Sequence, residues 1–324
     1  MTVAVVTGAS AGIGRATAVE FARKGYAVAL LARESPRLRA ACAQAGLSGA
    51  SVLEIAVDVA SEDAVECAAA RIEDDLGPID IWVNNAMVTV FGRFEDMTPQ
   101  EFARVTQVTY LGTVNGTRSA LRRMKRRDRG CIIQVGSALA YRSIPLQSAY
   151  CGAKAAVRGF TDSIRAELIH DRSRVRISMI QLAAFNTPQF DWARSHLPRR
   201  LQPVPPIFQP EIAGRAVAWL AEHPRRELWV GWPAVKAIVS TRMFPGLGDR
   251  FAAALAWDSQ QASEAATEHA NNLLEPVAGT WGVRGRFDHQ ARSFMPQLWL
   301  AKHRRWLQWL FLAIALGVGL WCTH

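Results

Sequence analysis

The sequence predicts an α/β protein with a doubly wound, Rossmann-like parallel sheet, and three observations support this prediction. Short apolar runs alternate with amphipathic stretches of helix length over about the first 235 residues. These runs are continuously apolar, as in parallel strands that helices cover on both faces. A glycine-rich stretch, TGASAGIGRA (Thr7 to Ala16), directly follows the first run.

Turn residues and charges bound the apolar runs and so set the expected elements. A helix is expected to begin at Thr98-Pro99-Gln100-Glu101, which supplies an N-cap, a proline at the first helical position and a capping-box glutamate. It is expected to run to about Arg126. The prolines near the end of Pro188–Pro210 predict an irregular loop there. Seven strands are expected, at Val3–Thr7, Ala27–Leu31, Ser51–Val57, Ile79–Asn84, Cys131–Ser137, Arg176–Leu182 and Leu228–Val230.

We expect one catalytic domain over residues 1–235, a linker or small helical extension over 236–300, and a basic flank with a hydrophobic helix over 301–324. Half of the residues are hydrophobic, which is enough for a full core. The formal net charge is +10, but no nucleic-acid-binding motif accompanies it, so nucleic acid is not expected as a partner.

Cysteine usage and the N-terminus indicate the compartment. The 5 cysteines are scattered singly and show no metal-ligand spacing, so a reducing compartment and no metal site are expected. The N-terminus has neither a charged n-region nor a cleavage site, and no signal peptide is expected.

The glycine stretch suits a phosphate group. Glycines at Gly8, Gly12 and Gly14 allow a sharp turn and a close approach of the ligand. The following helix N-terminus offers free N–H groups and a positive dipole end to a diphosphate. Taken alone, the same glycines would also fit a turn without a ligand.

With the spacing Gly-x-x-x-Gly-x-Gly, the chain resembles the classical short-chain dehydrogenase/reductase family. Asp58-Val59, Asn84-Asn85-Ala86 and the group Ser137, Tyr150 and Lys154 match further family motifs in order. The resemblance covers about residues 2–235 and implies a homodimer or homotetramer packed through Thr98–Arg126 and Tyr150–His170. The cofactor contacts that it implies are Gly8, Ser10, Gly12, Ile13, Gly14, Arg33, Asp58, Val59, Asn85, Ala86, Tyr150, Lys154 and Thr187.

The residue after the second strand favours NADP(H) over NAD(H). An NAD site needs a carboxylate there for the ribose 2′-hydroxyl, whereas an NADP site prefers a cation. Arg33 fills this position and suits a 2′-phosphate. Glu34 follows it and would repel the phosphate if it turned inward.

Tyr150 and Lys154 share one helix face, since they are four residues apart. A nearby ammonium lowers the pKa of a tyrosine, which then exchanges a proton with a carbonyl or alcohol oxygen. Ser137 would hydrogen-bond the reacting oxygen. The resemblance thus implies an oxidoreductase in which Ser137, Tyr150 and Lys154 are catalytic.

The chain departs from the family pattern in three places. Thr109 stands where the family has an asparagine that kinks the helix and holds a relay water, and Asn115 is a doubtful substitute. The usual Pro-Gly after the sixth strand is missing, although Thr187 is kept, and Met87 replaces a glycine. Two rivals therefore stay open: a weakly active or non-catalytic NADP-binding regulator or scaffold, and an isomerase or dehydratase on the same fold.

The substrate is expected to be a hydrophobic carbonyl or alcohol under a lid formed by the loop from Pro188. The lid lining is expected from Phe190, Trp192, Leu197, Ile207 and Phe208. An acidic substrate group would meet Arg194, His196, Arg199 and Arg200.

The C-terminal stretch Trp306 to Cys322 predicts a single membrane anchor. Its seventeen residues, apolar all round, span about 26 Å as a helix, slightly less than a hydrocarbon core of roughly 30 Å. A basic cluster, Lys302 to Arg305, precedes it and should keep the catalytic domain on the cytoplasmic side. A buried or interfacial helix is the alternative.

Overall fold

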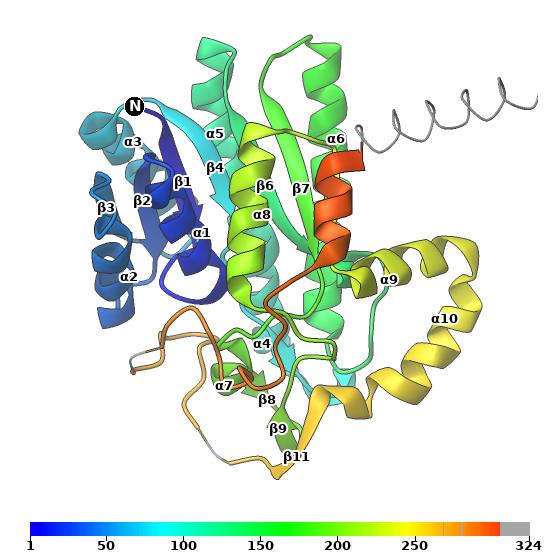
Figure 1. The fold of residues 1–324 in the computed structure, drawn as a ribbon. Coiled ribbons are helices and arrows are strands. Elements are labelled where there is room, and N and C mark those ends of the chain that lie inside the picture. The colour runs from blue at the N-terminus through cyan, green and yellow to red at the C-terminus, as the bar shows by residue number, and fades with distance from the viewer. Residues whose placement is uncertain (268, 280, 305–324) are drawn as a thin grey trace, which may run out of the picture.

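The computed structural model describes residues 1–267, 269–279 and 281–304 and confirms the Rossmann-like fold (Figure 1). Seven strands form one sheet in the order β10-β7-β6-β4-β1-β2-β3, and all neighbours run parallel. The strands are β1 (Val3–Thr7), β2 (Ala27–Ala32), β3 (Val52–Ala56), β4 (Ile79–Asn84), β6 (Cys131–Ser137), β7 (Arg176–Leu182) and β10 (Glu227–Val230).

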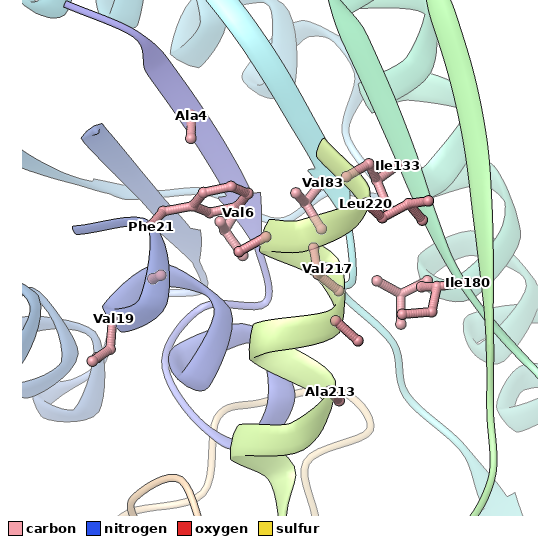
Figure 2. Close-up of a cluster of buried hydrophobic side chains, with 14 of the residues drawn as sticks. Ala4, Val6, Val19, Phe21, Val83, Ile133, Ile180, Ala213, Val217 and Leu220 are labelled. Atoms are coloured by element: carbon pink, nitrogen blue, oxygen red, sulfur yellow. The ribbon is translucent and has the colours of Figure 1, made fainter. Parts of the chain in front are cut away.

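Helices cover both faces of this sheet, because successive strand residues point to opposite sides. Ala4 and Val6 face a core under α1 (Gly12–Arg23), α2 (Pro36–Gly46) and α8 (Pro210–Glu222), which Figure 2 shows in part. Val3 and Val5 face the other core. That core lies under α3 (Glu62–Leu76), α4 (Pro99–Val105), α5 (Gly112–Arg127) and α6 (Ser148–His170).

The helix expected from Thr98 begins as predicted but is not α-helical throughout. The Thr98 hydroxyl accepts a hydrogen bond from Glu101 N, and the Glu101 carboxylate accepts one from Thr98 N, which completes the capping box. Between α4 and α5, residues Thr106–Leu111 form a π-helical segment. Such segments insert an extra residue and often occur at functional sites.

Shorter elements gather at the carboxyl end of the sheet. The segment Pro188–Pro210 is largely irregular, as predicted, and contains only short elements. Residues 296–304 are helical. The remaining elements are β5 (Val90–Phe91), α7 (Gln189–Trp192), β8 (Arg194–Ser195), β9 (Arg199–Leu201), α9 (Trp232–Met243), α10 (Pro245–Phe251), a π-helical segment (Ala252–Ala256), β11 (Gln261–Ala265), and 3-10 turns at Phe94–Asp96, Ala138–Ala140 and Asp258–Gln260.

The predicted membrane anchor, Trp306 to Cys322, lies outside the described residues. Within the part of the chain that the structure describes, no helix combines the length and apolar character needed to cross a membrane.

A buried polar network joins the centre of the sheet to α5. Asn84 accepts a hydrogen bond from Trp82 Nε1 (2.8 Å) and donates to Thr117 Oγ1 (3.0 Å) and Gln134 Oε1 (2.9 Å). Gly116 faces this network, and a Cβ atom there would lie 2.2 Å from Asn84 Oδ1. Glycine is therefore required at this position for α5 to approach the sheet.

We expect Gly116→Ala to lower the free energy of unfolding by about 1–3 kcal/mol, because the added methyl group displaces Asn84 and Trp82. Gly46→Ala is the matched control: it lies in α2 with nothing within 4 Å of the added Cβ, so alanine should be neutral or stabilise by up to about 1 kcal/mol. Urea unfolding followed by circular dichroism measures both. Equal stabilities of the two variants would contradict the prediction.

Candidate active site

The loop between β1 and α1 is fixed by contacts with the end of β4. Thr7 Oγ1 accepts hydrogen bonds from Asn85 N (2.9 Å) and Ala86 N (3.1 Å), while Asn85 Nδ2 donates to Thr7 O (2.9 Å). Gly8 adopts a φ of +65°, and a Cβ atom on Gly14 would lie 2.2 Å from Gly8 O. These glycines are therefore required by the turn and by the close approach of the helix to it.

A cavity of about 840 Å³ opens beside this loop, at the carboxyl ends of the strands. The strand order reverses between β1 and β4, which is where open α/β sheets bind their ligands. The structure places every predicted site residue on the wall of this one cavity: Gly8, Ser10, Gly12, Ile13, Gly14, Arg33, Asp58, Val59, Asn85, Ala86, Ser137, Tyr150, Lys154 and Thr187.

The catalytic candidates come from two neighbouring elements. Ser137 is the last residue of β6, and α6 carries Tyr150 and Lys154 one turn apart. The Lys154 ammonium donates to the carbonyl of Val135 in β6 (2.7 Å) and lies 5.7 Å from the centre of the Tyr150 ring. Lys154 is only 4% exposed, so this contact fixes its position.

Burial shifts the pKa values of both ionisable groups. It raises the pKa of the Tyr150 phenol above its ordinary value, although a hydrogen bond with Ser137 opposes this. It lowers the pKa of Lys154 to about 8. At neutral pH the tyrosine therefore keeps its proton and most of the lysine is still charged.

The end of the cavity nearest β2 is rich in arginine. Arg33 and Arg37 both line it, and neither forms an ion pair with any residue that the structure describes. Glu34, which follows Arg33, is exposed. The sequence did not indicate Arg37, because its place beside Arg33 depends on the turn between β2 and α2.

Asp58 is held by Arg104, another residue that the sequence did not indicate. Arg104 Nη2 lies 2.5 Å from Asp58 Oδ2, and Ala60 N donates to the other oxygen (3.0 Å). Burial alone would raise the pKa of Asp58, but these two contacts lower it below its ordinary value. The carboxylate is thus ionised and fixed at the cavity wall.

The Thr109 hydroxyl has no free proton with which to bind a relay water. It lies in the π-helical segment, is fully buried, donates to Val88 O (2.9 Å) and accepts from Val88 N (3.2 Å). Its only proton is therefore used by the backbone. Asn115 points to a different place, since its amide donates to Val59 O (3.0 Å).

None of the four loop cations that were expected to meet an acidic substrate group lines the cavity, and all four face carboxylates of the chain. Arg194 and His196 lie 2.7 Å and 2.9 Å from the two oxygens of Glu101. Burial alone would raise the pKa of Glu101, but these contacts and the Thr98 N–H lower it to about 2. The other two are paired at Arg199–Asp258 (2.7 Å) and Arg200–Asp191 (3.9 Å).

The expected apolar lid is only partly correct. Phe190 and Trp192 line the cavity, whereas Ile207 and Phe208 are buried away from it. Leu197 packs instead on a small cluster around Phe91. An apolar residue in a loop has no periodicity that tells whether it faces a cavity or the core.

Residues 232–256, which form α9, α10 and the next turn, supply a cavity wall that the sequence did not indicate. Arg142, at the cavity, donates to Pro245 O (3.2 Å) and lies 2.5 Å from Asp249 Oδ1, and so holds α10 in place. The side chains that α9, α10 and the next turn contribute to the cavity are mostly apolar: Pro233, Ala234, Ala237, Phe244, Leu247, Phe251, Ala252 and Ala256.

Comparisons with known proteins agree with this architecture. Residues 2–197 match the model of the short chain dehydrogenase family. The uncharacterized oxidoreductase YxnA of Bacillus subtilis is 33% identical over 276 residues, which cover 84% of this chain and 77% of YxnA.

Solved structures show the same likeness. An alcohol dehydrogenase of Thermococcus sibiricus, complexed with 5-hydroxy-NADP, aligns with a TM-score of 0.62 and 29% identity over 71% of this chain and 96% of its own. An NAD+-bound xylitol dehydrogenase aligns with a TM-score of 0.55 and 29% identity over 57% and 70%. The chain therefore belongs to the short-chain dehydrogenase/reductase family and is an oxidoreductase of the NAD(P)-dependent type.

Proposed function

We propose that this enzyme interconverts a hydrophobic carbonyl compound and the corresponding secondary or primary alcohol, with NADP(H) as cofactor. The observation that carries the proposal is that Ser137, Tyr150 and Lys154 line the same cavity as the glycine loop. Beyond these residues the cavity wall formed by α9 and α10 is largely apolar. This arrangement leaves space for a substrate next to a bound nicotinamide.

Tyr150 acts as the proton donor in reduction and as the acceptor in oxidation. The phenol keeps its proton at neutral pH and is therefore in the donor form that reduction requires. Ser137 donates a hydrogen bond to the reacting oxygen, and the ammonium of Lys154 stabilises the phenolate that remains. The nicotinamide, when bound, supplies or accepts the hydride.

The preference for NADP(H) is supported by the charges near β2. A 2′-phosphate bound there would meet Arg33 and Arg37. Glu34 does not line the cavity, and Asp58, which does, is paired with Arg104. Arginine suits a phosphate through paired, charge-assisted hydrogen bonds. An NAD-specific site would instead need a carboxylate at this position.

The likeness to oxidoreductases does not favour the rival reading as a non-catalytic regulator or scaffold. The buried Thr109 is compatible with weak activity, because its proton is not available to a relay water. Assembly into a homodimer or homotetramer through Thr98–Arg126 and Tyr150–His170 is also part of the proposal, on the resemblance alone.

Membrane attachment through Trp306 to Cys322 is proposed on the sequence. Exposed apolar side chains near the cavity mouth support a lipid-like substrate, since Phe244, Leu247 and Phe251 are all more than half exposed. A catalytic domain held at a membrane would meet such substrates at high local concentration.

Tyr150→Phe should lower kcat/KM by about 10²–10⁴-fold, because it removes the transferred proton and leaves the ring. We would follow NADPH oxidation by the detergent-solubilised enzyme with a panel of hydrophobic aldehydes and ketones. Tyr141→Phe is the matched control, since its hydroxyl binds Glu227 (2.7 Å) and should matter little to the rate. NADPH oxidation that persists in Tyr150→Phe would refute the assigned role, and binding without turnover on any carbonyl would favour the regulator.

Arg33→Ala and Arg37→Ala should each raise the Kd of NADPH by about 10- to 100-fold and leave the Kd of NADH nearly unchanged. Fluorescence titration with both cofactors measures this. Arg39→Ala is the control, because Arg39 is an exposed residue of α2, the helix that carries Arg37. Equal losses for both cofactors would show that the two arginines act on something other than the 2′-phosphate.

With Trp306 to Cys322 as a membrane anchor, we expect the full chain to stay in the membrane pellet after an alkaline carbonate wash. Ile314→Arg should release a large fraction, because a charge at the centre of a spanning helix costs about 2.5–3.5 kcal/mol. Leu47→Arg, at a position that is 86% exposed, should remain in the pellet. Release of the unaltered chain by the wash would rule out a spanning anchor.

A further inference from the structure

A segment far from the glycine loop in sequence lies directly against it. Residues 271–279 and 281–287, here called the strap, form the orange chain below α1 and α2 in Figure 1. The Gly12 N–H donates to Gly282 O (3.1 Å), and Arg15 Nη1 donates to Trp281 O (3.3 Å). The strap lies beyond the 2–197 range that matches the family model.

Three arginines hold the first half of the strap through its backbone: Arg33 and Arg37 at the cavity wall, and Arg104 of α4, which also pairs with Asp58. Arg33 donates to Asn272 O (2.7 Å) and Leu274 O (2.6 Å). Arg104 Nε donates to Leu273 O (3.1 Å), and Arg37 donates to Val277 O. Arg33 and Arg37, to which the proposed function assigns the 2′-phosphate, thus also bind the strap.

The second half of the strap is fixed to the loop after β7. Gly285 N donates to Asn186 O (3.1 Å), and Phe287 N donates to Asn186 Oδ1 (3.0 Å). Arg286 pairs with Asp191, which is almost fully buried. Trp281 packs edge-on against Trp192 of α7, with ring centres 5.4 Å apart.

The cavity continues beneath the strap. Asn272 and Pro276 line it together with Gly8, Arg33 and Asp58. A dinucleotide in this cavity would therefore lie between the glycine loop and the strap. Its phosphates would compete with strap carbonyls for the Gly12 N–H and for Arg33, and they carry the negative charge that a carbonyl lacks. The strap contacts with Asn186 and Trp192 would remain and hold the strap over the cofactor.

We propose that the strap is part of the dinucleotide site: it covers the adenosine half of the cofactor and must open for the cofactor to enter or leave. This inference rests on the proposed function, because it requires a dinucleotide in the cavity. The Trp281–Trp192 contact and the Asn186 contacts hold the strap closed. Loosening the strap accelerates both association and release.

The test is stopped-flow fluorescence of NADPH with the full chain in detergent, comparing Trp281→Ala with the unaltered enzyme. Trp281 does not line the cavity, so the change removes a strap contact and no cofactor contact. We expect release to become about tenfold faster, with faster association as well. Phe294→Ala, at a 70% exposed aromatic of the same extension, should leave both rates unchanged.

Hydrogen exchange provides a second measurement that does not depend on the variant folding. Amides of residues 271–279 and 281–287 should exchange more slowly when NADPH is bound. An unchanged rate of NADPH release in Trp281→Ala would overturn the strap inference and leave the proposed function intact. The same holds for amide exchange in the strap that is equal with and without NADPH. If neither NADPH nor NADH binds, both fail; if only NADH binds, the NADP preference fails and the same two measurements are made with NADH.

Discussion

The hydrogen bonds between Thr7 and the end of β4 are the constraint on which the rest of the site depends. One hydroxyl accepts from two successive N–H groups, and the Asn85 amide donates back to the β1 carbonyl. These bonds join the two strands at the point where the sheet order reverses. They fix the glycine loop relative to β4, and β6 pairs directly with β4. The distance from the glycine loop to Ser137 at the end of β6 is thereby set by the sheet and not by a mobile loop.

This dependence on the sheet explains how much could be predicted. Continuous apolar runs located all seven strands to within one or two residues, since the core requires them, and β2 differs only by including Ala32. The site residues follow strands whose carboxyl ends meet at one edge, so their convergence on one cavity was predictable as well. Ile207 and Phe208 were placed wrongly because a loop has no such geometry, and only the folded chain shows which of its side chains reach the core.

The arginines show a second limit of the sequence. Arg33, Arg37 and Arg104 donate to backbone carbonyls of the strap. Every residue type carries a backbone carbonyl, so the sequence does not show which residues accept these hydrogen bonds. The same contacts bear on the net charge of +10, because an arginine that binds a backbone carbonyl needs no carboxylate to balance it. Charge counting therefore points toward anionic partners, whereas part of the excess serves contacts within the chain.

The family resemblance assigns two roles to one asparagine: it kinks the helix and it holds a relay water. In this chain Thr109 takes its place and fills only the first role. The helix is still deformed, because Thr109 lies in a π-helical segment. The Thr109 hydroxyl accepts a hydrogen bond from Val88 N and donates one to Val88 O. The second role requires a side-chain donor for a water, and the single proton of Thr109 is already used. Lys154 directs its ammonium to Val135 O and remains mostly charged at neutral pH, so it can still stabilise the Tyr150 phenolate. Under the proposed mechanism, the replacement leaves the geometry of the proton transfer from Tyr150 in place, and we expect its effect on the return of a proton to Tyr150 from solvent.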